Sequence, residues 1–129
     1  MGNVFIKDPN LGVGCGPDVA PNQNAIIGPA TFSYTIVNDS DDEAYVSMVA
    51  AINVSTRPDP VFTEQDLQRF LAPHSSFARD SFSITGRAAF DQTGQITATA
   101  TLTFTLYPSG QVIFSDSVVC QFNVVDPTG

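Results

Sequence analysis

The sequence predicts an all-β domain in which two antiparallel sheets pack face to face. Three observations support this fold class. Long segments alternate between apolar and polar residues, turn sequences recur at a spacing of about ten residues, and only one short segment has helical character. The clearest segment is 95–107, where the even positions are apolar and threonine fills the odd positions from 97 to 105. This pattern indicates a strand with one buried and one exposed face.

The residues that follow this strand predict a long antiparallel hairpin. Pro108 and Gly110 are turn residues, and the inward apolar pattern resumes over 112–124. Asp116 is the one charged residue that interrupts this pattern. We therefore expect a β-bulge at 115–117 that carries the Asp116 carboxylate to solvent.

Two further strands are predicted upstream of the hairpin. Apolar residues alternate with polar ones over 31–37 and again over 46–54, and the acidic loop 38–43 joins the two segments. A fifth strand is expected from Phe77 to Ile84, with an extension to Phe90 left open.

One short segment, 63–70, has helical signals. Thr63 is suited to cap a helix, acidic residues fill the first turn, and Pro73 would end the element. We expect a short helical crossover here.

The first thirty residues differ in composition from the rest. A short apolar strand, Val4, Phe5 and Ile6, precedes a connector over 7–30 that is rich in Gly, Pro and Asn. We therefore divide the chain into an N-terminal arm, 1–30, and a sandwich domain, 31–129. The short strand could lie on its own sheet, or it could add to the sheet of a neighbouring copy, as in strand-addition fibres.

Cys15 and Cys120 are the only cysteines in the sequence. Cys15 lies in the connector, whereas Cys120 lies on the inward face of the last predicted strand. An intrachain disulfide, an interchain disulfide and two free thiols all remain open. Zinc is not expected, since two cysteines and one histidine are too few for a tetrahedral site.

Four carboxylates gather in the acidic loop, on Asp39, Asp41, Asp42 and Glu43. Closely spaced oxygen donors of this kind can hold Ca²⁺, although the loop lacks the glycine and the distant glutamate of an EF-hand. The alternative is a solvated turn without a metal.

Composition limits the classes of partner. The 129 residues include 5 basic and 13 acidic side chains, for a net charge of −8, which suits neither nucleic acid nor anionic membranes. No apolar run is long enough to span a bilayer, so membrane insertion is not expected. The first residues show no signal peptide. The chain could therefore stay inside the cell, leave by another route, or be a mature chain already processed.

Enzyme motifs are missing from the sequence. His74 is the only histidine, and no nucleophile elbow surrounds the serines beside it. No phosphate-binding loop is present, and no carboxylate pair suits glycoside hydrolysis. We therefore predict that the chain is not an enzyme.

Three segments together resemble bacterial immunoglobulin-like surface modules: FSYTIVNDS at 32–40, LAPHSSF at 71–77 and ITATATL at 96–102. The resemblance covers 31–125, and His74 stands where that family usually has glycine. It implies an immunoglobulin-like sandwich with a role in scaffolding, adhesion or self-assembly. A jelly roll is the alternative fold.

These observations predict a structural, self-assembling subunit of a surface fibre, appendage or shell. Copies of the chain would be its partners, joined through the N-terminal strand and a disulfide, outside the cell or on a particle surface. The alternative is a monomeric module that binds calcium or carbohydrate through the loop 38–43.

Overall fold

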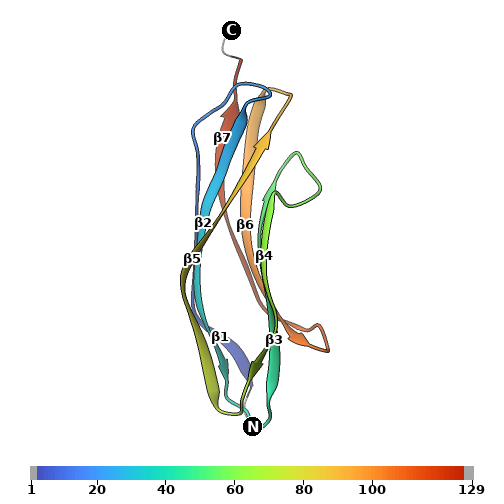
Figure 1. Ribbon diagram of the computed structural model, residues 1–129. Coiled ribbons are helices and arrows are strands. Elements are labelled where there is room, and N and C mark those ends of the chain that lie inside the picture. The colour runs from blue at the N-terminus through green and yellow to red at the C-terminus, as the bar shows by residue number, and fades with distance from the viewer. Residues whose placement is uncertain (1–2, 127–129) are drawn as a thin grey trace.

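Seven strands form two antiparallel sheets that pack face to face in the computed structural model, which describes residues 3–126. One sheet has the order β1-β2-β5 and the other has the order β4-β3-β6-β7 (Figure 1). The predicted all-β sandwich is therefore confirmed. The strands are β1 (Val4–Cys15), β2 (Asn24–Asn38), β3 (Ala44–Val54), β4 (Phe62–Leu71), β5 (Ser75–Ala89), β6 (Gly94–Tyr107) and β7 (Val112–Val124).

The core lies between the inner faces of β2, β3 and β6. Tyr34 and Phe104 meet edge to face across the two sheets, with ring centroids 4.7 Å apart. Phe32 packs beside Phe82 at 5.4 Å within the three-stranded sheet. The Tyr34 hydroxyl is buried and has no hydrogen-bond partner among the described residues, and burial raises the pKa of this phenol. Aromatic contacts of this kind hold the two sheets in one relative position.

The long hairpin predicted from the threonine pattern is present as β6 and β7. The even positions of β6 from 96 to 104 are all buried, and the threonines face outward. The expected bulge at 115–117 is wrong in position, because Asp116 pairs regularly with Leu102 and the irregularity lies at Ile113. Asp116 reaches solvent for another reason: β7 is an edge strand, so its inner face is only partly covered.

The predicted helical crossover over 63–70 is wrong, because this segment is most of strand β4. Thr63 pairs with Ala51 and Gln65 pairs with Val49, so hydrogen bonding to β3 replaces the helix that the capping residues favoured. A register shift opposite 46–48 interrupts the alternation of β4, and Gln68 adopts a positive φ of 53° near it. Sheet pairing has overridden a weak local preference.

The prediction of a connector over 7–30 is also wrong. Most of β1 and the first part of β2 lie in this range. Register shifts between Lys7 and Asn10 and between Ile27 and Ala30 change which residues face inward along each strand. A two-residue alternation read from the sequence is broken at these points, although the backbone continues as a strand.

Side chains close the open side of the sandwich between β4 and β5. The Arg79 guanidinium donates to a Glu64 carboxylate oxygen at 2.7 Å and lies 3.8 Å from the ring centroid of Phe82. Arg69 lies 3.7 Å from the ring centroid of Phe77 in the same way. The Arg79–Glu64 pair and the Arg69–Phe77 contact join edge strands of different sheets, by charge and by cation–π attraction.

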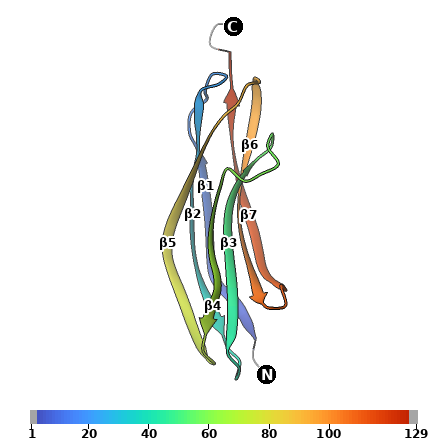
Figure 2. The same ribbon diagram turned by 45° about the vertical axis from the view of Figure 1, so that its right-hand side comes forward.

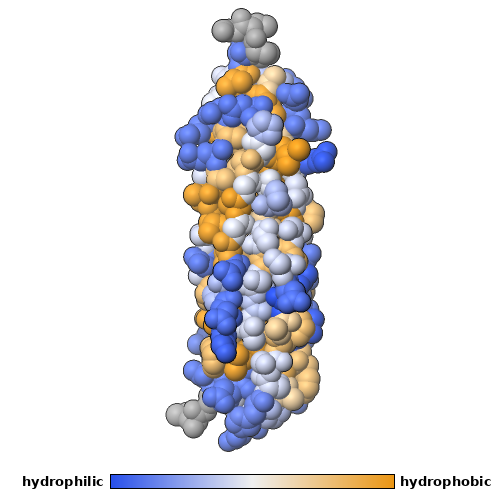
Figure 3. All heavy atoms as spheres, turned by 90° about the vertical axis from the view of Figure 1, so that its left-hand side faces the viewer, coloured by the Kyte–Doolittle hydropathy of each residue, from blue (hydrophilic) through white to orange (hydrophobic). Residues whose placement is uncertain are grey.

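The sandwich is elongated along its strands, as both views show (Figures 1 and 2). The first described residues lie at one end of the long axis and the last ones lie at the other. On the face drawn in Figure 3, hydrophobic side chains are interrupted by hydrophilic ones. Within 3–126, no helix is long and apolar enough to cross a membrane.

Candidate functional site

The N-terminal strand segment pairs with β2 of the same chain. Phe5 lies opposite Val37, and Ile6 lies opposite Ile36. Ile6 is half-buried against the core, whereas the Phe5 side chain is 39% exposed on the outer face. The structure thus shows this segment as the first strand of its own sandwich.

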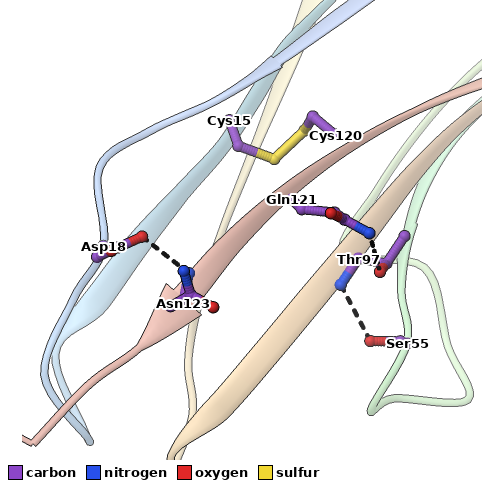
Figure 4. The surroundings of a disulfide bond; sticks show 7 residues. All are labelled: Cys15, Asp18, Ser55, Thr97, Cys120, Gln121 and Asn123. Carbon is purple, nitrogen blue, oxygen red and sulfur yellow. Dashed lines mark hydrogen bonds between the residues drawn. A yellow bond between two sulfur atoms is a disulfide. The ribbon is translucent and has the colours of Figure 1, made fainter.

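The two cysteines form an intrachain disulfide that joins β1 to β7 (Figure 4). Of the three alternatives left open by the sequence, this is the one present. Each residue lies at an edge of a different sheet, so the bond connects the two sheets along one open side. Their Cα atoms are 5.7 Å apart, within the range that a disulfide spans without moving the backbone.

The chain beyond Cys15 crosses from one sheet toward the other and strengthens the same side. Val19 forms a parallel bridge with Val124, and its amide donates to the Asn123 carbonyl at 3.1 Å. The Asp18 carboxylate accepts a hydrogen bond from the backbone N–H of Asn123 at 2.9 Å (Figure 4). The disulfide therefore lies within a wider set of contacts between the start of the chain and its last strand.

Asn38 connects two loops at the end of the sandwich where β1 begins. Its side chain is completely buried, and its amide nitrogen donates to the carbonyl oxygens of Asp42, Leu71 and Ala72 at 2.9, 3.2 and 3.1 Å. Its side-chain oxygen accepts from the Ser40 hydroxyl at 2.6 Å. One buried amide thus fixes both the loop after β2 and the loop after β4.

The acidic loop faces His74, which lies between β4 and β5. The His74 Nε2 atom is 2.7 Å from an Asp41 carboxylate oxygen, and Nδ1 is 3.4 Å from Asp39. The hydrogen bond to Asp41, followed by that to Asp39, raises the pKa of His74 above its usual value. Two of the four carboxylates that suggested a calcium site therefore lie against the His74 ring.

The four carboxylates predicted for calcium do not converge on one point. Among residues 3–126, no group of three or more His, Cys, Asp or Glu side chains is arranged to hold a metal ion. Asp42 serves the loop through its backbone carbonyl, which accepts hydrogen bonds from Asn38 and Ser40. Hydrogen bonds between groups of the protein thus hold this loop in place.

Asn38 and His74 have structural roles that local sequence patterns do not indicate. In the sequence Asn38 is the first residue of an acidic loop, and nothing near it reveals that its side-chain amide is buried beneath two loops. His74 adopts a positive φ of 52°, a conformation that favours glycine.

Comparisons with known proteins identify the fold alone. No protein-family model matches the sequence, and no curated protein is significantly similar to it. Among solved structures, a Bacteroides uniformis beta-glucuronidase 2, covalently bound to cyclophellitol-6-carboxylate aziridine, is similar with a TM-score of 0.52 at 12% identity. A second Bacteroides uniformis beta-glucuronidase has a TM-score of 0.51 at 12% identity. In both, the match covers 91% of this chain but only 12% of the enzyme.

We predict that replacing both cysteines with alanine lowers the free energy of unfolding by about 2–5 kcal/mol. The bond closes a loop with a sequence separation of 105, so its loss frees a long stretch of the unfolded chain. Urea denaturation of the double variant and the wild type measures the difference. Equal midpoints and slopes would contradict a stabilising disulfide.

We predict that Asn38→Ala destabilises the fold by about 1–3 kcal/mol, because three carbonyl groups lose their donor. Asn38→Asp should lower the free energy of unfolding more than Asn38→Ala does, since a buried carboxylate would face the same carbonyl oxygens. Ser40→Ala is the matched control and should cost less, because it removes only one hydroxyl. Denaturant unfolding of the three variants checks this order. An Asn38→Asp variant more stable than Asn38→Ala would contradict it.

The raised pKa of His74 predicts a pH-dependent contribution to stability. The charged imidazolium is favoured in the folded state, so this contribution is complete below about pH 6.5 and is lost as pH rises through the folded pKa. Since His74 is the only histidine, NMR titration of its ring protons gives this pKa directly. Asp41→Asn should lower it, whereas Asp42→Asn should have a much smaller effect. Equal shifts in both variants would argue against a specific pair.

Proposed function

We propose that this chain is a non-catalytic structural module of an extended assembly, such as a surface fibre, appendage or shell. The observation that carries the proposal is the disulfide-bonded, elongated sandwich whose first and last described residues lie at opposite ends (Figures 1 and 2). Modules with this arrangement can be joined end to end with little change in direction. Disulfides persist in oxidising compartments, which supports a place outside the cell or on a particle surface.

We infer an immunoglobulin-like sandwich in preference to a jelly roll. Seven strands in sheets of three and four are typical of immunoglobulin-like domains, whereas a jelly roll usually has eight. In immunoglobulin-like domains, the third, sixth and seventh strands lie side by side in one sheet. The strands β3, β6 and β7 have this order here. Here β4 joins this sheet instead of pairing with β5.

The surroundings of His74 support a non-catalytic role. Its ring nitrogens face the carboxylates of Asp39 and Asp41, and no hydroxyl group is hydrogen-bonded to the ring among the described residues. Neither cysteine is free, so a thiol nucleophile is also missing from residues 3–126. The similarity to glucuronidases covers too little of those enzymes to bring their activity to this chain.

The N-terminal segment is suited to exchange between copies. Val4 to Lys7 pair with β2, and an irregularity between Lys7 and Asn10, with Asp8 at a φ of 52°, separates them from the rest of β1. Cys15 lies beyond that irregularity. The first few residues could therefore leave β2 and pair with another copy while the disulfide stays intact.

A second disulfide across the pair Phe5 and Val37 tests this assembly. Directly opposed residues of antiparallel strands lie within disulfide range, so the variant Phe5→Cys/Val37→Cys should hold the segment on its own sheet. We expect the wild type to form ordered multimers and the oxidised double variant to stay monomeric. Sedimentation velocity and electron microscopy measure this, after mass spectrometry has verified the pairing.

The single variants Phe5→Ser and Val37→Ser control for loss of the two outward side chains. A wild type that stays monomeric at high concentration would overturn the assembly proposal. Multimers of the oxidised double variant equal to those of the wild type would overturn the role of the N-terminal segment.

A further inference from the structure

A shallow hollow of about 700 Å³ lies near the end of the sandwich where β1 begins. Three parts of the chain surround it: the first residues of β1, the loop before β3, and the turn between β6 and β7. The loop before β3 contains the four carboxylates that the sequence suggested for calcium or carbohydrate binding. Its residues Ser40 and Glu43 line the hollow, but Asp39, Asp41 and Asp42 do not.

Two partly exposed tyrosines line this hollow. Tyr45 lies directly opposite Tyr107 on neighbouring strands, and their ring centroids are 6.5 Å apart at an interplanar angle of 76°. Tyr45 is 36% exposed and Tyr107 is 50% exposed. Since the rings meet edge to face, they form an angled wall instead of a flat platform. Such a wall suits a single flexible chain molecule as ligand better than it suits the flat surface of a crystalline solid.

The polar groups beside the tyrosines include hydroxyl, amide and carboxylate side chains. Ser40 and Ser109 supply hydroxyls, Gln111 supplies an amide, and Glu43 is the one charged side chain in the lining. None of the basic residues lines the hollow, so an anionic ligand would find no counter-charge there. The lining therefore combines aromatic surface with neutral hydrogen-bonding groups and disfavours phosphate, sulfate and uronate groups.

We propose that this hollow binds a neutral saccharide chain. The C–H faces of a sugar are apolar and pack on tyrosine rings, while its hydroxyls both donate and accept hydrogen bonds. Gln111 and the Ser109 hydroxyl can complement both kinds of hydroxyl contact, and Glu43 can accept hydrogen bonds from sugar hydroxyls, whereas the Ser40 hydroxyl already donates to Asn38. The open shape of the hollow leaves room for a chain to continue beyond it in either direction. The proposal concerns the single chain, because Val4 and Phe5 line the hollow while the first residues of β1 pair with β2 of the same chain.

NMR titration of the ¹⁵N-labelled protein tests the site. The probes are cellohexaose, xylohexaose, mannohexaose and maltohexaose at up to ~10 mM, a range that detects weak affinities. An oligogalacturonate serves as the anionic probe. We expect at least one neutral probe to shift the amide signals of Glu43 to Tyr45 and Tyr107 to Gln111, and the anionic probe to leave them in place.

Variants separate the hollow from other exposed aromatic surface. Tyr107→Ala should weaken binding by about tenfold, which is the order expected for one aromatic contact, and Gln111→Ala should also weaken it. Phe62→Ala is the matched control: Phe62 is 41% exposed on the same sheet but does not line the hollow. Its binding should equal that of the wild type.

Three results would overturn the proposal. They are the absence of any signal shift with a neutral probe, equal binding by the Tyr107→Ala variant and the wild type, and binding of the charged probe alone. The titration is read on the monomeric fraction isolated by size exclusion, whereas the assembly proposal is judged by sedimentation and microscopy, so failure of one is distinct from failure of the other.

Discussion

Every sheet of a two-layer sandwich ends in edge strands, so the gaps along both sides must be closed by something other than backbone pairing. This chain closes them in two chemically different ways. Between β1 and β7 the disulfide Cys15–Cys120 joins the sheets covalently. Between β4 and β5 the guanidinium groups of Arg69 and Arg79 lie over phenyl rings, and Arg79 also pairs with Glu64. The aromatic core between the sheets depends on both closures to exclude water.

The end of the sandwich where β1 begins depends on a different interaction, the buried Asn38 amide. A completely buried amide is stabilising only when its donors and acceptor are all paired. Here they are paired with two loops that are distant in sequence, and one of these loops also carries His74 beside two aspartates. The position of Glu43, and with it one wall of the proposed saccharide hollow, therefore follows from hydrogen bonds made by a residue outside the hollow.

The sequence supported the fold class because several strands keep an unbroken alternation. β6 is the clearest example: its threonines occupy one face from end to end. The N-terminal strands could not be recognised in the same way. In β1 and β2, register shifts after Lys7 and after Ile27 exchange the inward and outward positions within one strand, so the pattern looks irregular although the pairing continues.

The candidate sites also differ in whether local sequence pattern or contacts between distant residues determine them. The two cysteines could be named from the sequence, but their pairing could not, because it depends on which edge strands lie side by side. β4 carried local helix signals that pairing with β3 overrides. The partners of Asn38 and the meeting of Tyr45 with Tyr107 likewise depend on contacts between residues far apart in the chain. No local rule reports such contacts.

The disulfide also determines how this molecule would carry mechanical load. When a sandwich is stretched from its two ends, tension follows the covalent backbone, and strands unfold in turn as they are pulled away. In this chain the shortest covalent path from Val4 to Val124 runs along β1, through the sulfur atoms, and along the last residues of β7. Residues 16–119 lie outside that path. Most of the domain would therefore remain unstretched under a pull that reaches the bond.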